Sequence, residues 1–422
     1  MIMEKFIITG GNPLSGSVRI SGSKNAVLPI LAASLLSSGV SIIHDVPKLL
    51  DVQVMKEVLE FLGCQVQWSG SVMTVDGAQV DSIEINDMLM RKMRASNLVM
   101  GPLLSRFGKV RISYPGGCAI GSRPMDLHLK GLIQMGAVIE EKFGFIDARA
   151  KNGRLNGAEI CLDFPSVGAT ENLMMAATLA KGRTTISNSA KEPEIYDLQC
   201  FLNSMGAKIS GAGTDLITIE GVDDLASTEY TVIPDRIEAG TFLIAGAITK
   251  SEIKVENVRV KHLDSLMFKL REMGLSLEEV ENGVIINGKE NLKPVDIKTM
   301  PYPGFPTDLQ PQMMALLTLA NGTSIVSENI FENRFKHVDE LRRMGANIKA
   351  EGKLAIIKGV KGLSGAYVNT TDLRAGAALV LTGLAAQGAT VVDEIYHIDR
   401  GYENFEQKLK KLGAKIIRVT TS

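Results

Sequence analysis

The chain contains 422 residues, of which 45% are hydrophobic and 22% are charged, and its formal net charge is −1. This length and hydrophobic content predict two or three domains with large cores. The near-zero charge argues against a nucleic-acid groove, because phosphate backbones select strongly basic surfaces. The four cysteines form no C-x-x-C pair and no Cys/His cluster with metal-ligand spacing, so we expect no metal site and a reducing, cytoplasmic setting.

The first residues, Met1-Ile-Met-Glu-Lys-Phe6, lack the basic start and the apolar core of a signal peptide. The longest uncharged run, from Ala26 to Ile43, is interrupted by Pro29 and Gly39. This run predicts a buried helix followed by a strand, and we expect no membrane span.

An internal repeat extends along the chain. A helix-like segment that ends in Leu-Gly or Met-Gly and leads into a β-rich stretch occurs six times, with its glycine at Gly63, Gly136, Gly206, Gly274, Gly345 and Gly413. The glycines are about seventy residues apart, which is the signature of a repeated structural unit.

A second pattern marks the same units: an apolar helix, usually a glycine, and then an alternating strand. Examples run from Leu179 to Ile186 and from Leu319 to Ile325. A glycine after a helix followed by a period of two is typical of a helix-to-strand exit. The preceding helices, such as Met313 to Leu319, are apolar nearly all round, which predicts burial inside a bundle with strands on the outside. The predicted class is therefore α/β, with buried helices and outer sheets.

The ends of the chain complement one another. The last repeat stops after Ile416-Ile-Arg-Val419, one strand short, and the segment from Phe6 to Gly11 has the pattern of the missing strand. We therefore expect the N-terminal segment to pair with the last repeat. Six repeats then divide into two three-repeat domains, residues 23–232 and residues 1–22 plus 233–422, with the active site expected in the interdomain cleft.

The segment Tyr114-Pro-Gly-Gly-Cys-Ala-Ile-Gly-Ser-Arg-Pro124 predicts a mobile loop that carries reactive groups. A thiol at Cys118 beside Arg123 can have a lowered pKa and serve as a proton donor or nucleophile. The alternative for a lone cysteine is a buried, inert thiol. We expect that alternative for Cys64, Cys161 and Cys200.

Other distinctive segments lie at element boundaries, where sites are usually built. Their cations, together with that of the Cys118 loop, predict a dense cationic pocket for substrates with several phosphates and carboxylates: Lys24, Arg94, Arg123, Arg334, Arg374 and Arg400. For any single arginine the alternative is a solvated surface charge.

Five motifs carry a family resemblance: Gly-Ser-Lys-Asn, Pro-Gly-Gly-Cys-x-Ile-Gly-x-Arg-Pro, Phe-Pro-Thr-Asp, Phe-Glu-Asn-Arg-Phe and Asp-Arg-Gly-Tyr. Over essentially the whole chain the sequence resembles the UDP-N-acetylglucosamine enolpyruvyltransferases, which perform the first committed step of bacterial peptidoglycan synthesis. The resemblance implies two inside-out α/β barrel domains with threefold pseudo-symmetry.

The implied reaction transfers the enolpyruvyl group of phosphoenolpyruvate to the 3-hydroxyl of UDP-N-acetylglucosamine by addition and elimination, with release of phosphate. It needs no cofactor. The implied protein is a cytoplasmic monomer or weak oligomer without nucleic-acid or membrane partners, and it serves cell-wall biogenesis, cell shape and cell division.

The resemblance also implies roles for matching residues. Cys118 is the general acid, which fosfomycin alkylates, and Asp308 receives the proton of the sugar hydroxyl. The residues that bind phosphoenolpyruvate are Lys24, Asn25, Arg123, Arg374 and Arg400, of which Lys24 and Arg400 count as catalytic. The UDP-sugar positions are Arg94, Arg123, Pro124, Met125, Asp126, Leu127, Ser166, Val167, Gly168, Asp308 and Ile330, with Arg334 beside them. This chain departs from the family pattern at two places. Met125 stands where a smaller aliphatic residue is commoner, and Phe164-Pro165 stands where some members of the family carry a lysine.

Alternatives remain for the site and for the function. Asp308 lies before an apolar helical run, so an N-cap role is open. The related 3-phosphoshikimate enolpyruvyltransferase shares the six-unit architecture. A catalytically silent UDP-sugar-binding paralogue and an RNA-end-processing enzyme of similar repeat architecture are more distant alternatives.

Overall fold

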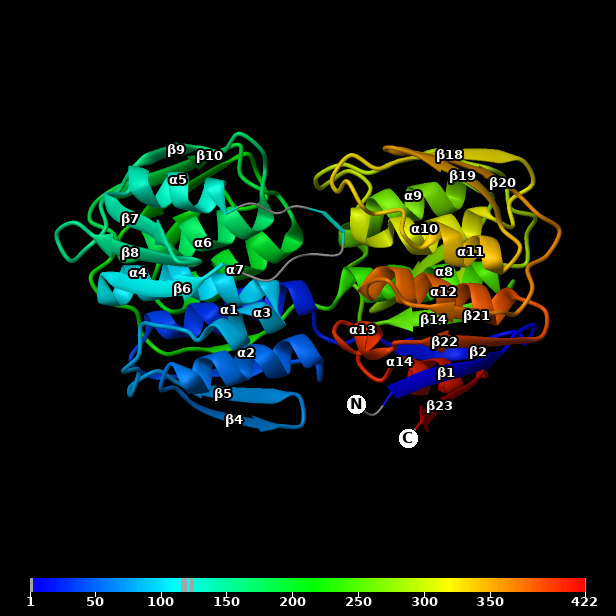
Figure 1. Ribbon diagram of the computed structural model, residues 1–422, viewed down its shortest axis with the longest axis horizontal. Helices are drawn as coiled ribbons and strands as arrows, with labels where there is room; N and C mark the ends of the chain where they lie inside the picture. Colours follow the sequence, from blue (N-terminus) through cyan, green and yellow to red (C-terminus); the bar gives the residue numbers. More distant parts are fainter. Residues whose placement is uncertain (1–2, 115–119, 122–124, 422) are drawn as a thin grey trace. The chain divides into compact units, whose positions relative to one another are not determined.

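The computed structural model describes residues 3–114, 120–121 and 125–421. By its internal contacts the chain divides into two compact units. Unit 1 comprises Met1–Ser21, Ala119–Ser122 and Pro234–Ser422, and unit 2 comprises Gly22–Cys118 and Arg123–Ile233. Each unit contains three small sheets and a set of buried helices, as the sequence predicted (Figure 1).

Unit 1 has three four-stranded sheets, ordered β21-β22-β1-β23, β15-β16-β14-β2 and β17-β18-β20-β19. Their strands are β1 (Met3–Thr9), β2 (Ser15–Arg19), β14 (Glu252–Glu256), β15 (Ser276–Val280), β16 (Gly283–Asn287), β17 (Ile297–Lys298), β18 (Thr323–Ser327), β19 (Asn347–Glu351), β20 (Leu354–Lys358), β21 (Tyr367–Asn369), β22 (Ala389–Asp393) and β23 (Lys415–Thr421). Its helices are α8 (Arg236–Ile248), η3 (Val260–Leu263), α9 (Asp264–Glu272), η4 (Thr307–Leu309), α10 (Gln310–Leu317), α11 (Val338–Arg343), α12 (Leu373–Ala385), α13 (Tyr396–Asp399) and α14 (Phe405–Lys411).

Unit 2 has sheets ordered β13-β3-β5-β4, β11-β12-β10-β9 and β6-β8-β7. Their strands are β3 (Val40–His44), β4 (Gln65–Ser69), β5 (Val72–Asp76), β6 (Lys109–Ser113), β7 (Ala137–Lys142), β8 (Phe145–Ala150), β9 (Glu159–Cys161), β10 (Arg183–Ser187), β11 (Lys208–Ser210), β12 (Leu216–Glu220) and β13 (Glu229–Thr231). Its helices are α1 (Lys24–Ala33), η1 (Ser34–Leu36), α2 (Leu50–Phe61), α3 (Asp87–Lys92), η2 (Arg94–Val99), α4 (Met100–Phe107), α5 (Asp126–Gln134), α6 (Val167–Ala177) and α7 (Pro193–Ser204).

The central helices are buried on every side, because their sequences are apolar all round. All residues of α8 are buried, and α6 is buried from Ala169 to Ala177. In unit 1, α8, α10 and α12 lie between the sheet of β18 and β20 and the sheet of β1, β22 and β23 (Figure 1). The strands alternate buried and exposed residues, as in β14 and β10. This alternation lets one face of each sheet cover the helical core while the other faces solvent.

The six repeat glycines end the outer helices. Each has a positive φ, between 88° and 102°: Gly63, Gly136, Gly206, Gly274, Gly345 and Gly413. A residue with a Cβ is strained in that left-handed conformation, which terminates a helix and turns the chain into the next strand. The repeat pattern thus reflects one backbone turn used six times.

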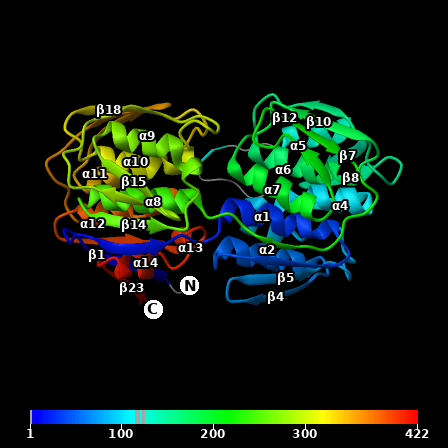
Figure 2. The same ribbon diagram turned by 180° about the vertical axis from the view of Figure 1, so that it is seen from behind.

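Strand β1 completes the last repeat. It pairs antiparallel with β23, with Ile8 opposite Ile416 (Figure 2), and antiparallel with β22 on its other side (Figure 1). The side chains of Phe6 and Ile8 are fully buried in the core of unit 1. The predicted pairing of the two ends of the chain is therefore confirmed.

Candidate active site

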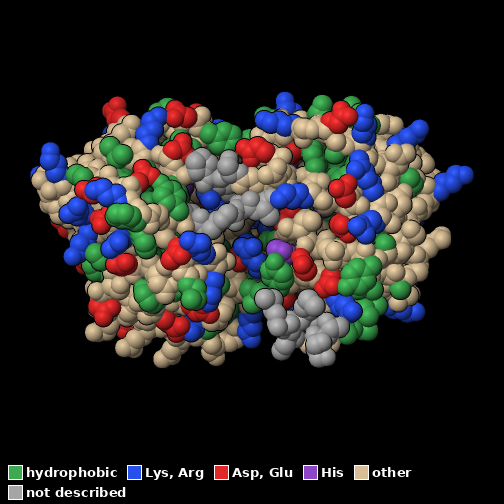
Figure 3. Space-filling view, viewed as in Figure 1, with side chains coloured by type: hydrophobic (Ala, Val, Ile, Leu, Met, Phe, Trp, Pro, Cys, Tyr) green, Lys and Arg blue, Asp and Glu red, His purple; other side chains and the backbone are tan. Residues whose placement is uncertain are grey.

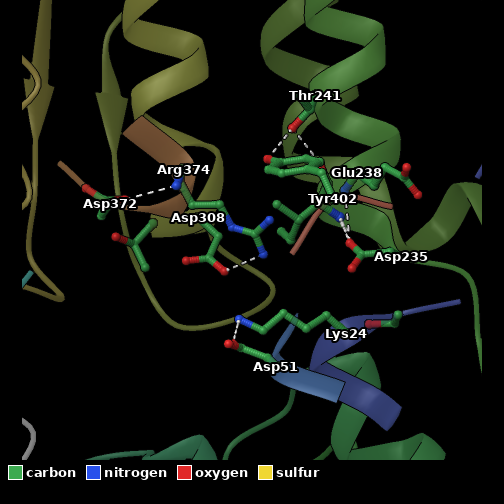
Figure 4. A network of polar contacts seen from close by, with 12 residues as sticks. Lys24, Asp51, Asp235, Glu238, Thr241, Asp308, Asp372, Arg374 and Tyr402 are labelled. Atoms are coloured by element: carbon green, nitrogen blue, oxygen red, sulfur yellow. Dashed lines mark hydrogen bonds and ion pairs between the residues drawn. The ribbon is translucent and has the colours of Figure 1, made fainter. Parts of the chain in front are cut away.

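Asp308 lies in unit 1 between two buried arginines. Its Oδ1 atom is 3.1 Å from Nη2 of Arg334, and its Oδ2 atom is 3.1 Å from Nη2 of Arg374 (Figure 4). The arginine side chains are 2% and 3% exposed, whereas that of Asp308 is 27% exposed. Two cations therefore hold the carboxylate from the protein side and leave part of it accessible.

The N-cap alternative for Asp308 is wrong. Within the described chain, neither η4 nor α10 has a side-chain hydrogen bond at its N-cap, and the two N-cap residues are Pro306 and Leu309. The carboxylate of Asp308 is engaged with arginines instead. An isolated Thr-Asp before an apolar run cannot reveal this, since Arg374 follows 66 residues later.

A second carboxylate fixes the start of the helix that carries Arg374. Asp372 is the N-cap of α12, and its Oδ1 atom accepts hydrogen bonds from the backbone N–H groups of Arg374 at 2.9 Å and Ala375 at 3.2 Å (Figure 4). The same oxygen is 3.9 Å from Nη1 of Arg334. Asp372 thus supports both arginines that hold Asp308, one through the backbone and one through charge.

Histidines close to this cluster add no positive charge at neutral pH. Burial lowers the pKa of His337 to about 4; the charge of Arg334 adds to the decrease and Asp372 opposes it. Burial, followed by the charge of Arg400, also lowers the pKa of His397. Arg400 is half-buried at the C-cap of α13. The positive charge around Asp308 and Asp372 therefore comes from arginines.

Lys24 is held at the first turn of α1 in unit 2. Ser23 caps this helix, and Nζ of Lys24 is 2.8 Å from Oδ2 of Asp51, whose side chain is 4% exposed (Figure 4). A cation at a helix N-terminus is opposed by the helix dipole, and the buried carboxylate offsets that cost. Asn25 is the next residue and is half-buried. An unfavourable charge kept in place by a buried partner is typical of a functional position.

The predicted UDP-sugar residues of unit 2 lie at the starts of three helices. Arg94 begins η2, Asp126 and Leu127 begin α5 after Met125, and Val167 and Gly168 begin α6 after its N-cap Ser166. Helix α6 has no acidic residue in its first turn, and its first-turn N–H groups and positive helix end suit an anionic ligand.

A buried asparagine that the sequence did not reveal links the helices that carry these residues. Oδ1 of Asn172 accepts a hydrogen bond of 2.7 Å from the backbone N–H of Gly101, and Nδ2 donates to the carbonyl of Asn97 at 3.0 Å. Nδ2 also lies 3.1 Å from Nδ1 of His128. Asn172 of α6 is thereby linked to η2, α4 and α5 at once.

His128 lies beneath Gly168. A Cβ added to Gly168 would be 3.4 Å from Cε1 of His128. Burial, and then the charge of Arg94, lowers the pKa of His128 to about 4, so its ring is neutral at neutral pH. Met125 is 3% exposed, and its sulfur lies 3.0 Å from Nδ2 of Asn97. Met125, which differs from the commoner family residue, is therefore accommodated as a buried side chain in the core of unit 2.

The other residues predicted for the site lie either outside the described residues or in unit 1 rather than at the helix starts of unit 2. Cys118, Arg123 and Pro124 lie outside the described residues. Ile330 is half-buried in unit 1, and its N–H donates to Oε1 of Glu328 at 2.9 Å. Phe164, at the second departure, is 45% exposed.

The three described cysteines differ in burial. Cys64 is buried, and desolvation raises the pKa of its thiol to about 12, so it is inert as expected. Cys200 is half-buried. Cys161 is exposed, and the expectation of burial is wrong there. In β9 the neighbouring Ile160 takes the inward position, and alternation turns Cys161 outward.

Surface charge, metal-ligand groups and long apolar helices give no sign of a second kind of site in the described part of the chain. On the face seen in Figure 3, Lys and Arg side chains are interspersed with Asp and Glu, without a broad field of one sign. In the described part of the chain no group of three or more His, Cys, Asp and Glu side chains could hold a metal ion. Over the same residues, no helix has both the length and the apolar character that a membrane crossing requires.

Comparisons with known proteins agree on one family. The family described as EPSP synthase (3-phosphoshikimate 1-carboxyvinyltransferase) matches residues 8–409. UDP-N-acetylglucosamine 1-carboxyvinyltransferase 1 of Symbiobacterium thermophilum is 57% identical over 421 residues, which are 99% of this chain and 95% of that protein. The protein of the same name from Halalkalibacterium halodurans is 58% identical over 418 residues, with 99% and 95% covered. The crystal structure of the enolpyruvyl transferase NikO from Streptomyces tendae has a TM-score of 0.90 and 26% identity, and covers 100% of both chains.

Proposed function

This chain belongs to the UDP-N-acetylglucosamine 1-carboxyvinyltransferase family, and we propose that it transfers the enolpyruvyl group of phosphoenolpyruvate to the 3-hydroxyl of UDP-N-acetylglucosamine. The observation that carries the proposal is the carboxylate of Asp308, which is partly exposed and fixed by Arg334 and Arg374. A carboxylate in a fixed orientation can accept a proton from a hydroxyl within hydrogen-bond reach.

The anionic substrate groups meet cations and helix starts. In this proposal Lys24, Asn25, Arg123, Arg374 and Arg400 bind the phosphate and carboxylate of phosphoenolpyruvate. Charge-assisted hydrogen bonds from guanidinium groups to such anions are shorter and stronger than neutral ones. Arg374 meets this requirement well, because its guanidinium is buried and oriented by Asp308.

The UDP-sugar has its own set of groups. We propose that the first turn of α6, from Ser166 to Gly168, binds the diphosphate together with Arg94, since the N-terminus of a helix favours negative charge. The start of α5, from Met125 to Leu127, and Ile330 complete the set with Arg123 and Pro124.

The reaction consists of an addition followed by an elimination. Cys118 gives a proton to the methylene carbon of phosphoenolpyruvate, and the sugar oxygen bonds to the neighbouring carbon while Asp308 takes the hydroxyl proton. In the second step the same groups act in reverse: the Cys118 thiolate takes a proton from the new methyl group, the bond from carbon to the phosphate oxygen breaks, and the departing phosphate takes the proton held by Asp308, so the double bond returns and both side chains regain their starting forms. The arginines stabilise the anions throughout.

The biological setting follows from the proposed product. An enolpyruvyl ether of UDP-N-acetylglucosamine would enter peptidoglycan synthesis in the cytoplasm, and the enzyme would thereby serve cell shape and division. A thiol nucleophile at Cys118 would make the enzyme a target of the epoxide fosfomycin. Its cysteines are few and without a disulfide pattern, which suits a reducing compartment.

Release of phosphate from phosphoenolpyruvate, with and without UDP-N-acetylglucosamine, tests the proposal. We expect release only when the UDP-sugar is present. Release with shikimate 3-phosphate in place of the UDP-sugar would instead establish the alternative enolpyruvyl acceptor, and no release with either acceptor would establish a silent paralogue.

A further inference from the structure

Tyr402 lies in a closed polar triangle at the core of unit 1. Its side chain is 1% exposed, and its hydroxyl lies 3.0 Å from Oγ1 of Thr241 and accepts a hydrogen bond of 3.0 Å from Nε2 of Gln312. Nε2 of Gln312 also donates to Thr241 at 3.1 Å. Thr241 belongs to α8 (Figure 4) and Gln312 belongs to α10, so two central helices fix the hydroxyl of Tyr402.

The ring anchored in this way lies against Arg374. The guanidinium carbon of Arg374 is 5.2 Å from the centre of the Tyr402 ring, within the range of a cation–π interaction. The guanidinium is also bonded to Asp308 at 3.1 Å, and it interacts with the hydroxyl of Tyr402 as well as with its ring. A π face and a carboxylate together restrict the plane of the guanidinium, which sets the directions of its N–H donors.

The segment that carries Tyr402 also packs closely against α12. A Cβ at Gly401 would be 2.6 Å from a methyl carbon of Leu373, so a larger residue there would require the Leu373 side chain to shift. The N–H of Tyr402 donates to the carbonyl of Ile398 at 3.0 Å, which closes the turn around Arg400. Tyr402 is therefore placed to orient Arg374 through its ring and Arg400 through two residues of backbone.

We propose that Tyr402 is a positioning residue for anion binding, because its ring face sets the orientation of Arg374 and its anchored backbone that of Arg400. The inference rests on the proposed function in one respect: the anion is phosphoenolpyruvate. Removal of the ring should then weaken binding of phosphoenolpyruvate and spare the UDP-sugar. A residue that acts only in the core would affect the stability of unit 1 without this difference.

Phe405 offers a matched control. It is 1% exposed, its ring centre is 4.8 Å from that of Tyr402, and it also packs against Phe242 at 5.7 Å. Phe405 belongs to the same aromatic cluster, and in the described part of the chain its ring packs against the rings of Tyr402 and Phe242. Phe405→Leu therefore reproduces the loss of a buried ring without removing the face on which Arg374 lies.

The test compares steady-state constants for both substrates in Tyr402→Met, Tyr402→Phe and Phe405→Leu, with Tm measured for each. Methionine fills the volume of the ring without a π face. We expect the KM for phosphoenolpyruvate to rise about tenfold in Tyr402→Met, as loss of a buried cation–π contact predicts. The KM for the UDP-sugar should change less than about twofold. Phe405→Leu should lower Tm similarly and leave both KM values near those of the unaltered protein.

Tyr402→Phe keeps the ring face and removes the hydroxyl, which contacts Thr241, Gln312 and Arg374, so the KM for phosphoenolpyruvate is expected to rise less than in Tyr402→Met. In an Arg374→Lys background the effect of Tyr402→Met should largely disappear, because the planar guanidinium is gone.

Equal changes in both KM values, an unchanged KM for phosphoenolpyruvate, or the same pattern in Phe405→Leu would overturn the proposal. If Tyr402→Met does not fold, a tenfold rise in Tyr402→Phe would contradict the role of the ring face. Inactivity of the unaltered protein would contradict the proposed function instead.

Discussion

The Oδ2 atom of Asp308 lies 3.1 Å from Nη2 of Arg374, and the two residues come from different repeats of unit 1. Because Arg374 and Arg334 are buried, the carboxylate balances two cations that water cannot reach easily. Removal of this charge therefore affects both the chemistry and the local stability.

Asp308→Asn should lower the turnover of phosphate release by about 10²–10⁴-fold, because an amide cannot accept the hydroxyl proton. Its side chain still fills the space between the arginines, so the protein should remain folded. Steady-state assays with both substrates and a Tm measurement check this result.

Asp308→Ala should have a comparable loss of turnover with a lower Tm than Asp308→Asn, since it leaves both arginines without this partner. A suitable control is Asp223→Asn, because Asp223 is 94% exposed and pairs with Arg154 at the surface. Turnover in Asp308→Asn within threefold of that of the control would refute the role of Asp308 as the base.

Cys118→Asp should retain substantial turnover and Cys118→Ala should lose most of it, because aspartic acid keeps a short protonatable group at that position. Fosfomycin should inactivate the unaltered protein and spare the Asp variant, since a thiolate is the better nucleophile toward an epoxide. Mass spectrometry locates the adduct. The exposed thiol of Cys161 is the internal control, and an adduct there with Cys118 unmodified would contradict the assignment.

His128 should make the protein less stable as the pH falls from about 6.5 to about 4. Its pKa is about 4 in the folded protein because of burial and Arg94, and 6.5 is the ordinary value. Between these values the unfolded chain binds the additional proton, so the free energy of unfolding increases with pH. The contribution of His128 is complete above about 6.5 and is lost as the pH falls toward 4.

Urea unfolding at several pH values checks this expectation in His128→Gln. The slope of unfolding free energy against pH should be smaller than in the unaltered protein by up to about 1.4 kcal/mol per pH unit. Buried Glu171 and Glu238 have raised pKa values because of burial and contribute a slope of opposite sign. The comparison between variant and unaltered protein removes that contribution, and identical slopes would show that His128 is not buried as a neutral ring.

Asn172→Ala should destabilise the protein by about 2–5 kcal/mol, because it leaves the N–H of Gly101 and the carbonyl of Asn97 buried without their partner. It should also raise the KM for UDP-N-acetylglucosamine, since Asn172 links the helices whose first turns are proposed to bind the UDP-sugar. Thermal unfolding and kinetics measure the two effects.

Asn203→Ala is the control for Asn172, because Asn203 also makes two hydrogen bonds to the backbone, both to Ile209 at 2.9 Å, away from those helix starts. It should reduce stability without a change in either KM. The proposed link fails if Asn172→Ala and the control give the same kinetic constants.

Deletion of residues 1–12 should destabilise unit 1, since β1 bridges β22 and β23 and buries Phe6 and Ile8. Hydrogen exchange should show the loss of protection in β22 and β23. The milder change Ile8→Ala should cost about 2–5 kcal/mol by leaving a cavity. Loss of protection confined to residues 30–220 would contradict the importance of this pairing.

Local chemistry determined the parts of the fold that the sequence could predict. The turn at Gly136 needs a positive φ, and a helix such as α10 is apolar on all sides, so both features are visible in a single stretch of chain. The strand pattern of Phe6 to Gly11 indicated that the two ends of the chain pair, because the last repeat lacks one strand and would otherwise leave the backbone groups of its neighbouring strands unpaired. The residue types of the site were likewise visible as motifs.

The tertiary structure alone decided which side chains meet. Asp308 pairs with Arg374 across 66 residues, and Asn172 reaches His128 across 44, because helices of different repeats pack side by side. Alternation in β9 could not tell whether Ile160 or Cys161 faces the core, since a period of two fixes the spacing and not the face. Partner choice and burial depend on the packing of distant elements, and a pattern read along the chain contains only the nearest neighbours.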